Sequence, residues 1–546
     1  MEKRTILAIV ISLIILVAYQ EIFMKKFMKP QSVNDNTTTM QVKPEKKTQE
    51  VATVKKKTIQ PEKKINKIKE VIKNPNEKFL NVENSVFKLT FSNKGGAITK
   101  CILKKYFVTY KRQKNVVLFD KVRDYPIENE IIVNDYKIPR DTVYNVDISS
   151  YNVYVENKPY KITFYKDFGT FLFKKIYTVL PDKYQIDLEY EFINKSKTPL
   201  KIENSTFYFR TEKLKKAKYQ FEGSCFLVDG VLKEVSVKKI EKEKIRQYTK
   251  NVQWFGYSEV YFLAVILKKK DYFDIAKTYI SDNNVVLEGI KNFNLKINDK
   301  VTDKNYLYFG PKKYDILKSY HAGLERSINY GIFDFLAKPL MIVLNFFYKY
   351  IHNYGVAIIL LTLLIKLIFY PLTQKSYESM KKMKDLQPHI NRIKEQYKND
   401  KAKLNQEIME LYKKYKVNPF GGCLPMIIQI PVFFALYKAL LNSIELRHAP
   451  FISHIPFTDK VWLVDLSVKD PYYITPILMG LSMFVQQKMT PTGGDALQEK
   501  LMYFMPIFLT FLFLNFPSGL VIYWLANNIL SIIQQYMVNK KMEKSK

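Results

Sequence analysis

The sequence lacks the residue patterns that most enzyme active sites and metal centres need. It has only three cysteines and five histidines in 546 residues. The histidines form no His-Glu-x-x-His or Cys/His metal pattern, and neither a Gly-x-Ser-x-Gly motif nor a phosphate-binding glycine loop occurs. These absences predict a protein that is not an enzyme and that needs no metal or other cofactor.

The scarcity of cysteine also excludes a disulfide framework. Cys101 and Cys225 could pair if they meet in an oxidising compartment. Alternatively they are two independent buried thiols, which the sequence favours without deciding the matter.

The net charge of +35 would indicate nucleic-acid binding in a soluble protein. Here the lysines are scattered, and no RNP, zinc-finger or basic-helix motif accompanies them. We therefore attribute the charge to a compositional bias and expect no sequence-specific nucleic-acid binding.

Residues 1–24 are expected to form a membrane anchor. An apolar run, Thr5–Tyr19, follows Lys3 and Arg4, and no small-residue cleavage site follows the run, so a retained anchor is favoured over a cleaved signal peptide. Residues 25–78 are rich in Lys, Thr, Pro, Gln and Asn and poor in aromatics, which predicts a disordered tether.

Residues 79–318 have the pattern of a large β-sandwich. The alternating stretch Val86–Phe91 ends at the turn signal Asn93-Lys94-Gly95-Gly96. Further strands are predicted within Phe171–Asn194, Trp254–Leu267 and Asn305–Phe309. Many short strands with little helix favour two packed sheets.

The apolar period lengthens to that of a helix after this domain. Residues 319–350 are expected to hold a linker and an amphipathic helix that carries Asp334, Lys338 and Lys349 among apolar residues. Such a helix would lie along the membrane interface. A helix packed under the β-domain is the alternative.

Long apolar runs dominate the chain from about residue 340 onward. We expect five membrane helices within a core at 351–538, and the N-terminal anchor makes six spans. The expected helices lie at about 352–372, 420–441, 472–489, 501–516 and 519–537.

The loops between these helices predict their orientation. Residues 373–418 and the tail, 539–546, are strongly basic, whereas the loop at 442–471 has a balance of acidic and basic residues. The positive-inside rule therefore places 373–418 and both termini in the cytoplasm. Residues from about 25 to 350 would then lie on the outer side.

The basic loop at 373–418 is expected to form an antiparallel helical hairpin. Apolar residues recur at three- and four-residue steps on both sides of Asn399-Asp400. The hairpin either docks a partner or only caps the bundle. Its apolar positions are Met383, Leu386, Ile390, Ile393, Leu404, Ile408 and Leu411.

Lys366 places a full charge inside the apolar stretch Gly355–Lys375. A charge inside hydrocarbon costs roughly 2.5–3.5 kcal/mol on insertion scales, so it faces protein or water unless its side chain reaches the surface. Polar side chains in this and other spans favour a water-accessible cavity over a surface-seeking lysine. They are Thr362, Gln429, Gln486, Asn527, Asn528 and Ser531.

The expected helix at 501–516 offers an apolar surface without charge. Methionine and phenylalanine dominate its first turns, and methionine adapts its shape to irregular partners. The residues expected to contact the apolar part of a substrate are Met502, Phe504, Met505 and Phe508.

Several short motifs occur in order between about residues 340 and 540. They are Tyr370-Pro371-Leu372-Thr373, Leu386-Gln387-Pro388, Asn418-Pro419-Phe420-Gly421-Gly422-Cys423-Leu424-Pro425, Gln429-Ile430-Pro431, Glu445-Leu446-Arg447, Asp470-Pro471-Tyr472-Tyr473, Gln487-Lys488-Met489 and Phe516-Pro517-Ser518-Gly519-Leu520. Trp254-Phe255-Gly256 and Phe309-Gly310-Pro311-Lys312 give a looser match in the β-domain. Together the motifs resemble the YidC/Oxa/Alb family of membrane insertases, in its Gram-negative form with a large periplasmic domain.

The resemblance implies an α-helical polytopic membrane bundle with a five-helix core and a periplasmic β-supersandwich. It also implies a hydrophilic groove that is open to cytoplasm and lipid, closed to the periplasm, and supplied with a basic residue. The family usually has arginine where this sequence has Lys366. Lysine keeps the charge but lacks the planar fork that binds carboxylates through two hydrogen bonds.

The expected function is insertion of nascent proteins into the bacterial inner membrane, with assistance to their folding. The resemblance implies that the protein acts alone or with the Sec translocon. The ribosome would be a transient partner, and the lipid bilayer would receive the product.

Two other functions remain open. A secondary transporter would use Lys366 as a coupling charge and would show inverted repeats and broken helices in paired positions, neither of which the sequence displays. An envelope scaffold would act through the β-domain and use the bundle as an anchor.

Overall fold

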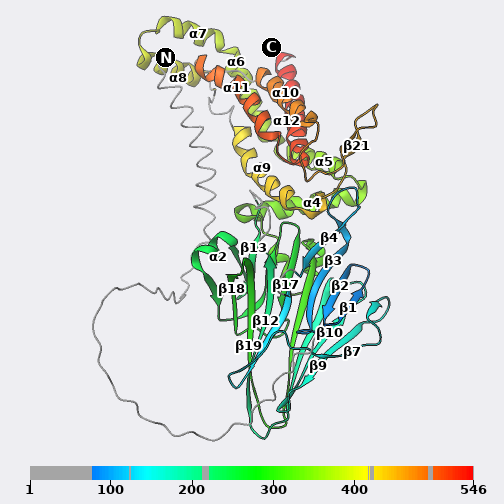
Figure 1. The fold of residues 1–546 in the computed structure, drawn as a ribbon. Helices are drawn as coiled ribbons and strands as arrows, with labels where there is room; N and C mark the ends of the chain where they lie inside the picture. The colour runs from blue at the N-terminus through cyan, green and yellow to red at the C-terminus, as the bar shows by residue number, and fades with distance from the viewer. Residues whose placement is uncertain are drawn as a thin grey trace, which may run out of the picture. The chain divides into compact units, whose positions relative to one another are not determined.

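The computed structural model describes residues 77–121, 125–211, 220–415, 417, 424–489 and 496–544. The expected N-terminal anchor lies outside these residues, as does nearly all of the expected tether. The described chain contains a β-rich domain followed by a helical region (Figure 1).

Two large sheets, of eleven and nine strands, make up the β-rich domain. The first has the order β15 (Ile245–Tyr248), β18 (Ile275–Ser281), β19 (Asn284–Leu295), β12 (Leu200–Thr211), β5 (Ile127–Val133), β3 (Ala97–Phe107), β2 (Phe87–Ser92), β1 (Phe79–Glu83), β8 (Asn152–Tyr154), with β4 (Asn115–Asp120) on β3 and β6 (Tyr136–Ile138) on β5. The second has the order β14 (Val231–Ser236), β13 (Gly223–Val228), β16 (Val252–Ser258), β17 (Phe262–Leu267), β20 (Lys300–Pro311), β11 (Gln185–Asn194), β10 (Phe171–Val179), β9 (Tyr160–Asp167), β7 (Asn145–Asp147).

One hydrophobic core draws side chains from both sheets. In β10, Phe171, Phe173 and Tyr177 are fully buried, while the intervening Leu172 and Lys174 are partly exposed. This period of two places alternate side chains on opposite faces of a strand. The predicted two-sheet domain is therefore present, and its aromatic side chains fill the space between the sheets.

The helical region begins after the β-domain and contains nine α-helices among the described residues, with a short hairpin between two of them. They are α4 (Asp334–Ile351), α5 (Tyr354–Ile368), α6 (Tyr370–Asp385), α7 (Gln387–Gln396), α8 (Lys401–Lys414), α9 (Leu424–Asn442), the hairpin β21 (Ile452–His454) and β22 (Val461–Leu463), α10 (Ile474–Met489), α11 (Ala496–Phe513) and α12 (Ser518–Lys544).

The first expected core helix, 352–372, is broken in the structure. Helix α5 ends at Ile368, and the chain bends by 70° before α6 begins. Pro371 lies in the first turn of α6, where its missing N–H leaves no intrahelical bond unmade. Lys366 consequently lies in the last turn of α5 rather than well inside a longer span.

The expected hairpin at 373–418 also differs from the structure. Its first arm is two helices, because α6 ends before Gln387-Pro388 and Pro388 opens α7. Tyr377 and Met380 of α6 pack with Val538 of α12 instead of with α8. The hairpin that remains consists of α7 and α8.

Helix α4 has two apolar faces. Ala337, Met341 and Leu344 are buried in the core of the bundle. On the other face, Phe335 is 75 % exposed and Tyr350 67 %. The segment Gly331–Ile351 is the one helix of the described residues that is long and apolar enough by itself to cross a membrane, and α5 with α6 passes the same test only as a bent pair.

Cys101 and Cys225 are both buried and unpaired. The two thiols therefore belong to the β-domain core, as the second of the two alternatives proposed.

Candidate functional site

Helix α12 carries a row of buried polar side chains. Asn528 and Ser531 are 3 % and 1 % exposed, and Asn527 is 8 % exposed. At 100° per residue these three positions fall on one side of the helix. Buried amides and hydroxyls need hydrogen-bond partners, and this row finds partners on three neighbouring helices.

Lys366 of α5 is the charged member of the site. Its Nζ donates to Ser531 Oγ at 2.7 Å, and the side chain is only 7 % exposed. Ser531 Oγ in turn donates to the Asn527 carbonyl oxygen at 2.8 Å. Among the residues that the structure describes, no carboxylate pairs with this ammonium group. The lysine is therefore held by a neutral hydroxyl, which leaves its charge uncompensated.

The amides of α12 extend the site to α9 and α10. Asn527 Nδ2 donates to Gln429 Oε1 of α9 at 3.2 Å. Asn528 Nδ2 donates to Ser482 Oγ of α10 at 3.0 Å. Four helices thus supply the polar groups, and α12 contacts each of the other three.

Thr362 and Gln486 occupy less central positions. Thr362 is 1 % exposed, but its hydroxyl donates to the Ile358 carbonyl of its own helix at 2.7 Å. Gln486 is half-buried on α10. Both were predicted as site residues. The Thr362 hydroxyl bonds within its own helix, outside the hydrogen-bonded chain from Lys366 to Gln429.

Sequence reasoning missed polar residues further along α12. Gln534 donates through Nε2 to Thr373 Oγ1 at 2.8 Å, and Gln535 donates to the Met489 carbonyl at 2.9 Å. Gln535 Oε1 is buried without a hydrogen-bond partner. These residues follow Ser531 by three and four positions, so continuing the helical period would have found them.

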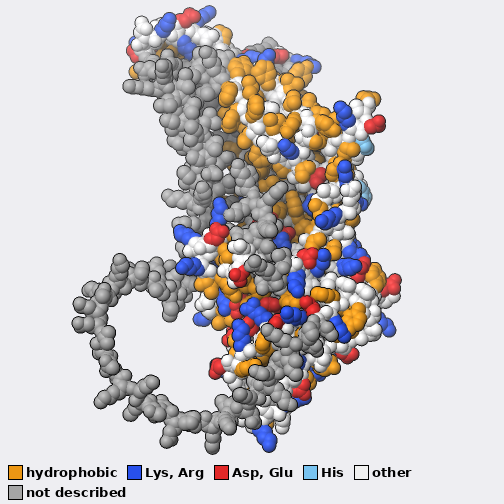
Figure 2. Space-filling model, in the orientation of Figure 1, with side chains coloured by type: hydrophobic (Ala, Val, Ile, Leu, Met, Phe, Trp, Pro, Cys, Tyr) orange, Lys and Arg blue, Asp and Glu red, His pale blue; other side chains and the backbone are white. Residues whose placement is uncertain are grey.

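The predicted apolar contact residues on α11 are partly at the surface. Phe504 is 54 % exposed and Met505 40 %, and the Phe504 ring stacks near that of Phe508 with centroids 6.4 Å apart. The side chain of Met502 lies outside the described part. Figure 2 shows hydrophobic side chains gathered over the helical region, in contrast to the mixed charges over the β-domain.

The predicted hairpin positions divide into two groups. Met383, Leu386 and Ile390 are buried in a small core with Tyr412 and Val417, against which two further predicted residues, Ile408 and Leu411, pack. The remaining positions are half-buried; they are Ile393 and Leu404.

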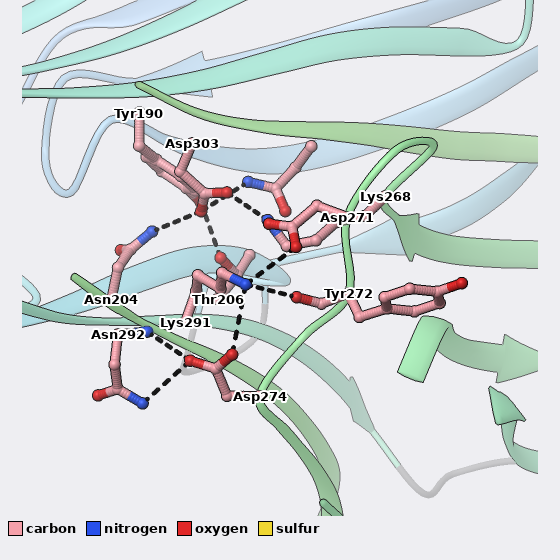
Figure 3. Close-up of polar contacts among 11 residues, drawn as sticks. Tyr190, Asn204, Thr206, Lys268, Asp271, Tyr272, Asp274, Lys291, Asn292 and Asp303 are labelled. Carbon is pink, nitrogen blue, oxygen red and sulfur yellow. Dashed lines mark hydrogen bonds and ion pairs between the residues drawn. The ribbon is translucent and has the colours of Figure 1, made fainter. Parts of the chain in front are cut away.

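A second buried polar cluster lies in the β-domain, between the two sheets. Asp303 of β20 accepts hydrogen bonds from Lys268 Nζ, from Asn305 Nδ2 at 3.1 Å and from Asn204 Nδ2 at 3.4 Å. Figure 3 shows Lys268 and Asn204 converging on this carboxylate. Lys268 is fully buried and Asp303 is 4 % exposed, so the pair is shielded from water.

Lys175 of β10 is another buried lysine of this domain. Its Nζ donates to Asn129 Oδ1 at 2.8 Å and to the Gly95 carbonyl at 3.2 Å. Burial lowers the pKa of Lys175 to about 7, and the nearby Glu128 carboxylate opposes part of that shift. Asn129 Nδ2 approaches Asn204 Oδ1 at 3.5 Å and links this lysine to the Asp303 cluster.

The two polar sites differ in what they can do. The β-domain cluster is internally paired and fully enclosed, which suits a structural role. The site on α12 has donors and acceptors on four helices and a cation without a counter-ion, so it can attract an anionic or hydrophilic segment.

Comparisons with known proteins bear on both regions. The family model "60Kd inner membrane protein" matches residues 346–545, and the model "YidC periplasmic domain" matches residues 80–343. A protein of Syntrophus aciditrophicus named "Membrane protein insertase YidC" is 41 % identical over 99 % of this chain and 100 % of its own length. A protein of the same name from Geotalea uraniireducens is 39 % identical, again over 99 % of this chain and 100 % of its own.

One solved structure spans most of the chain. It is a crystal structure of an active YidC insertase with its first transmembrane domain resolved, 18 % identical, and it covers 85 % of this chain and 93 % of its own with a TM-score of 0.38.

Proposed function

The chain belongs to the YidC family of membrane protein insertases, and we propose that the polar face of α12 with Lys366 forms the groove that moves hydrophilic segments of nascent inner-membrane proteins. The observation that carries this proposal is the burial of Lys366 against Ser531 without a carboxylate partner among the described residues. A buried cation that is already neutralised would have little attraction for a substrate. Lys366 has no such partner among the described residues and would therefore attract an anionic segment.

The groove would act by lowering the cost of taking polar groups into the membrane. A polar group without a partner in hydrocarbon costs several kcal/mol. Lys366, Gln429 and Asn527 offer charge and hydrogen bonds inside the bundle. A short hydrophilic tail would therefore exchange water for these side chains part-way across.

Release would follow from the apolar part of the substrate. The exposed side chains of α11, among them Phe504 and Met505, offer a surface along which an apolar segment would slide toward lipid. Burial of that segment in hydrocarbon would drive the step. No covalent chemistry or cofactor is needed.

The proposal includes a topology of six spans. Residues 1–24, α5 with the start of α6, α9, α10, α11 and α12 would cross the inner membrane, with both termini in the cytoplasm and residues from about 25 to 350 in the periplasm. Helix α4 would lie along the outer interface through its exposed apolar face, which includes Phe335 and Tyr350.

Partners follow from this topology. The basic helices α7 and α8 would receive substrate or the ribosome that makes it, through electrostatic attraction to RNA or acidic chain. The protein would work alone or beside the Sec translocon and would assist the folding of its products.

Substitution of Lys366 tests the groove. Lys366→Ala is expected to reduce insertion of a substrate with an acidic translocated tail at least tenfold, and to affect a neutral tail less. Lys366→Arg should behave as wild type because the charge is kept. The matched control is Lys375→Ala, which removes an exposed lysine of α6. Normal insertion of the acidic tail by Lys366→Ala in a depletion strain would refute the mechanism.

Two further experiments separate the alternatives. Reconstitution in liposomes with and without the Sec translocon would show whether insertion needs that partner. Deletion of residues 80–300 should leave most insertion intact, whereas complete loss would favour a scaffold acting through the β-domain.

A further inference from the structure

Apolar side chains of α12 lie on a different side of the helix from the polar row. At 100° per residue, the mean direction of Leu525, Ala526 and Ile529 is roughly 160° from that of Asn527, Asn528 and Ser531. Helix α12 therefore separates two environments, and the apolar side borders a cavity.

This cavity has a volume of about 330 Å³. It is lined by Leu525, Ala526 and Ile529 of α12, Ile359 of α5, Leu478 of α10, Phe451 and Trp462 of β22, among others. We call it the α5–α10 groove. Helix α12 contacts both α5 and α10, and the three helices lie in the same part of the bundle in Figure 1.

The chemistry of the lining selects an apolar ligand. The one hydroxyl among the lining residues belongs to Thr475, and it already donates to Asp470 Oδ2 at 2.8 Å. Trp462 Nε1 likewise donates to Asp470 Oδ1 at 2.9 Å. Polar groups at the rim are thus directed away from the groove, and a ligand with a polar body would lose its hydrogen bonds to water without replacement.

The groove opens onto the lipid-facing surface of the bundle. Leu478 and Ile529, which line it, are 44 % and 45 % exposed. Their neighbours on α10 continue the same apolar surface, with Ile477 58 % and Leu481 60 % exposed. In an inner-membrane protein such a surface meets lipid tails, so the groove is continuous with the interface that the membrane already covers.

We propose that the α5–α10 groove binds one hydrocarbon chain of a membrane lipid. A cavity of about 150 Å³ holds benzene, so about 330 Å³ suits a chain of roughly a dozen carbons. The lining leaves no free side-chain hydrogen-bond partner for a polar ligand, so an acyl chain suits the groove.

A bound chain would pack against α5, α10 and α12 together. Ile359 of the groove lies about 10.5 Å along α5 from Lys366, so the chain would support the helices that carry the contact between Lys366 and Ser531 without touching that contact. The lipid then acts as a structural ligand of the bundle. This role concerns the opposite face of α12 from the proposed groove for substrate.

Spin-labelled lipid tests the proposal on the full chain. The purified protein is placed in nanodiscs that contain a phosphatidylglycerol with a nitroxide near the middle of one chain. Wild type should show a saturable immobilised component of about one lipid per protein. Ala526→Phe, which enlarges a lining residue of α12, should lower the immobilised component at least fivefold. Ile359→Phe, which enlarges a lining residue of α5, should lower it as much.

The matched control is Leu512→Phe, which enlarges a 48 % exposed residue of α11, a helix that supplies no lining residue of the groove, and should leave the component unchanged. An unchanged component in both filling variants would overturn the proposal. So would displacement of the labelled lipid by an apolar single-span peptide, because the groove would then be a substrate site.

A second measurement needs no filling variant. Lipids brominated at mid-chain quench the fluorescence of nearby tryptophan side chains, and Trp462 lines the groove. The quenched signal of wild type should exceed that of Trp462→Phe, and equal quenching would contradict an acyl chain at this site. Both readouts measure lipid, so their failure is distinct from a failure of the insertion mechanism.

Discussion

The β-domain and the helical bundle both bury lysine, and they treat the charge in different ways. In the β-domain, Lys268 meets the carboxylate of Asp303, which two asparagines also contact. In the bundle, Lys366 donates to the hydroxyl of Ser531 and meets no carboxylate among the residues that the structure describes. The first arrangement neutralises its cation and the second does not.

Under the proposed function, this difference separates a lysine that stabilises the fold from a lysine that acts on the substrate. A buried pair with satisfied hydrogen bonds costs little relative to an apolar core, but loss of one partner leaves an uncompensated charge. A cation that folding leaves uncompensated contributes nothing favourable to stability, and its position in a membrane protein points to function. A buried lysine therefore stabilises the fold in the β-domain, whereas in the bundle we assign it to the proposed function.

The largest expected effect comes from breaking the paired charge. Lys268→Met should destabilise the β-domain by about 3–5 kcal/mol, because the Asp303 carboxylate remains buried without its cation. Hydrogen exchange of β17 and β20 in the solubilised full chain measures the change. The double variant Lys268→Met/Asp303→Leu should recover most of the loss, and equal loss in both variants would contradict this account.

The second effect is a pH dependence that arises from Lys175. Because burial lowers its pKa to about 7, the unfolded chain binds more protons than the folded chain above that pH, and stability rises with pH. Between pH 7 and pH 9 the gain should be about 2 kcal/mol. Pulse proteolysis of the β-domain in urea measures it.

The matched variants for this test are neighbours in sequence. Lys175→Met should remove the pH-dependent gain, while Lys174→Met should keep it, since Lys174 is a partly exposed partner of Glu191. A flat profile in wild type would show that Lys175 does not titrate as described.

A smaller effect is expected from the hydroxyl that holds Lys366. Ser531→Ala removes the hydrogen bond from Lys366, worth about 0.5–1.5 kcal/mol, together with the bond from the hydroxyl to the Asn527 carbonyl. Insertion of an acidic tail should fall by less than in Lys366→Ala, because the charge remains. A loss as large as that of Lys366→Ala would mean that the hydroxyl, and not the cation, carries the attraction.

The smallest effect sharpens the comparison most. Lys366→Met makes the same substitution as Lys268→Met, yet it should leave the stability of the bundle unchanged or slightly higher, since no partner carboxylate is left behind among the described residues. Thermal loss of helical circular dichroism in detergent measures this. Destabilisation comparable to that of Lys268→Met would place Lys366 among the structural lysines.

Much of the architecture could be predicted from the sequence. Alternating stretches predicted the strands β2, β10 and β11, two further predicted stretches fall on β16, β17 and β20, and apolar runs predicted helices where α9 to α12 lie. The bend after Ile368 was not predicted, although Pro371 marks it. An apolar run records that a segment is buried in lipid or protein, and it carries less information on where the helix axis turns.

The polar sites were predicted unevenly for a physical reason. Asn527 and Asn528 stand out because polar side chains are rare in apolar runs. Lys268 and Asp303 did not stand out, because Lys268 follows a strand and Asp303 lies among lysines, as residues on a solvated face do. Their pairing depends on two strands, β17 and β20, that lie side by side only in the folded sheet.

The contact between Lys366 and Ser531 can form only after both residues have been synthesised. The two residues are 165 positions apart in the chain. At about 5–20 residues per second, synthesis of Ser531 follows that of Lys366 by roughly 8–33 s. For that interval α5 exists without the helix whose Ser531 contacts Lys366. Under the proposed topology, the newly made protein would therefore itself hold a charged side chain in the membrane before its hydrogen-bond partner has been synthesised.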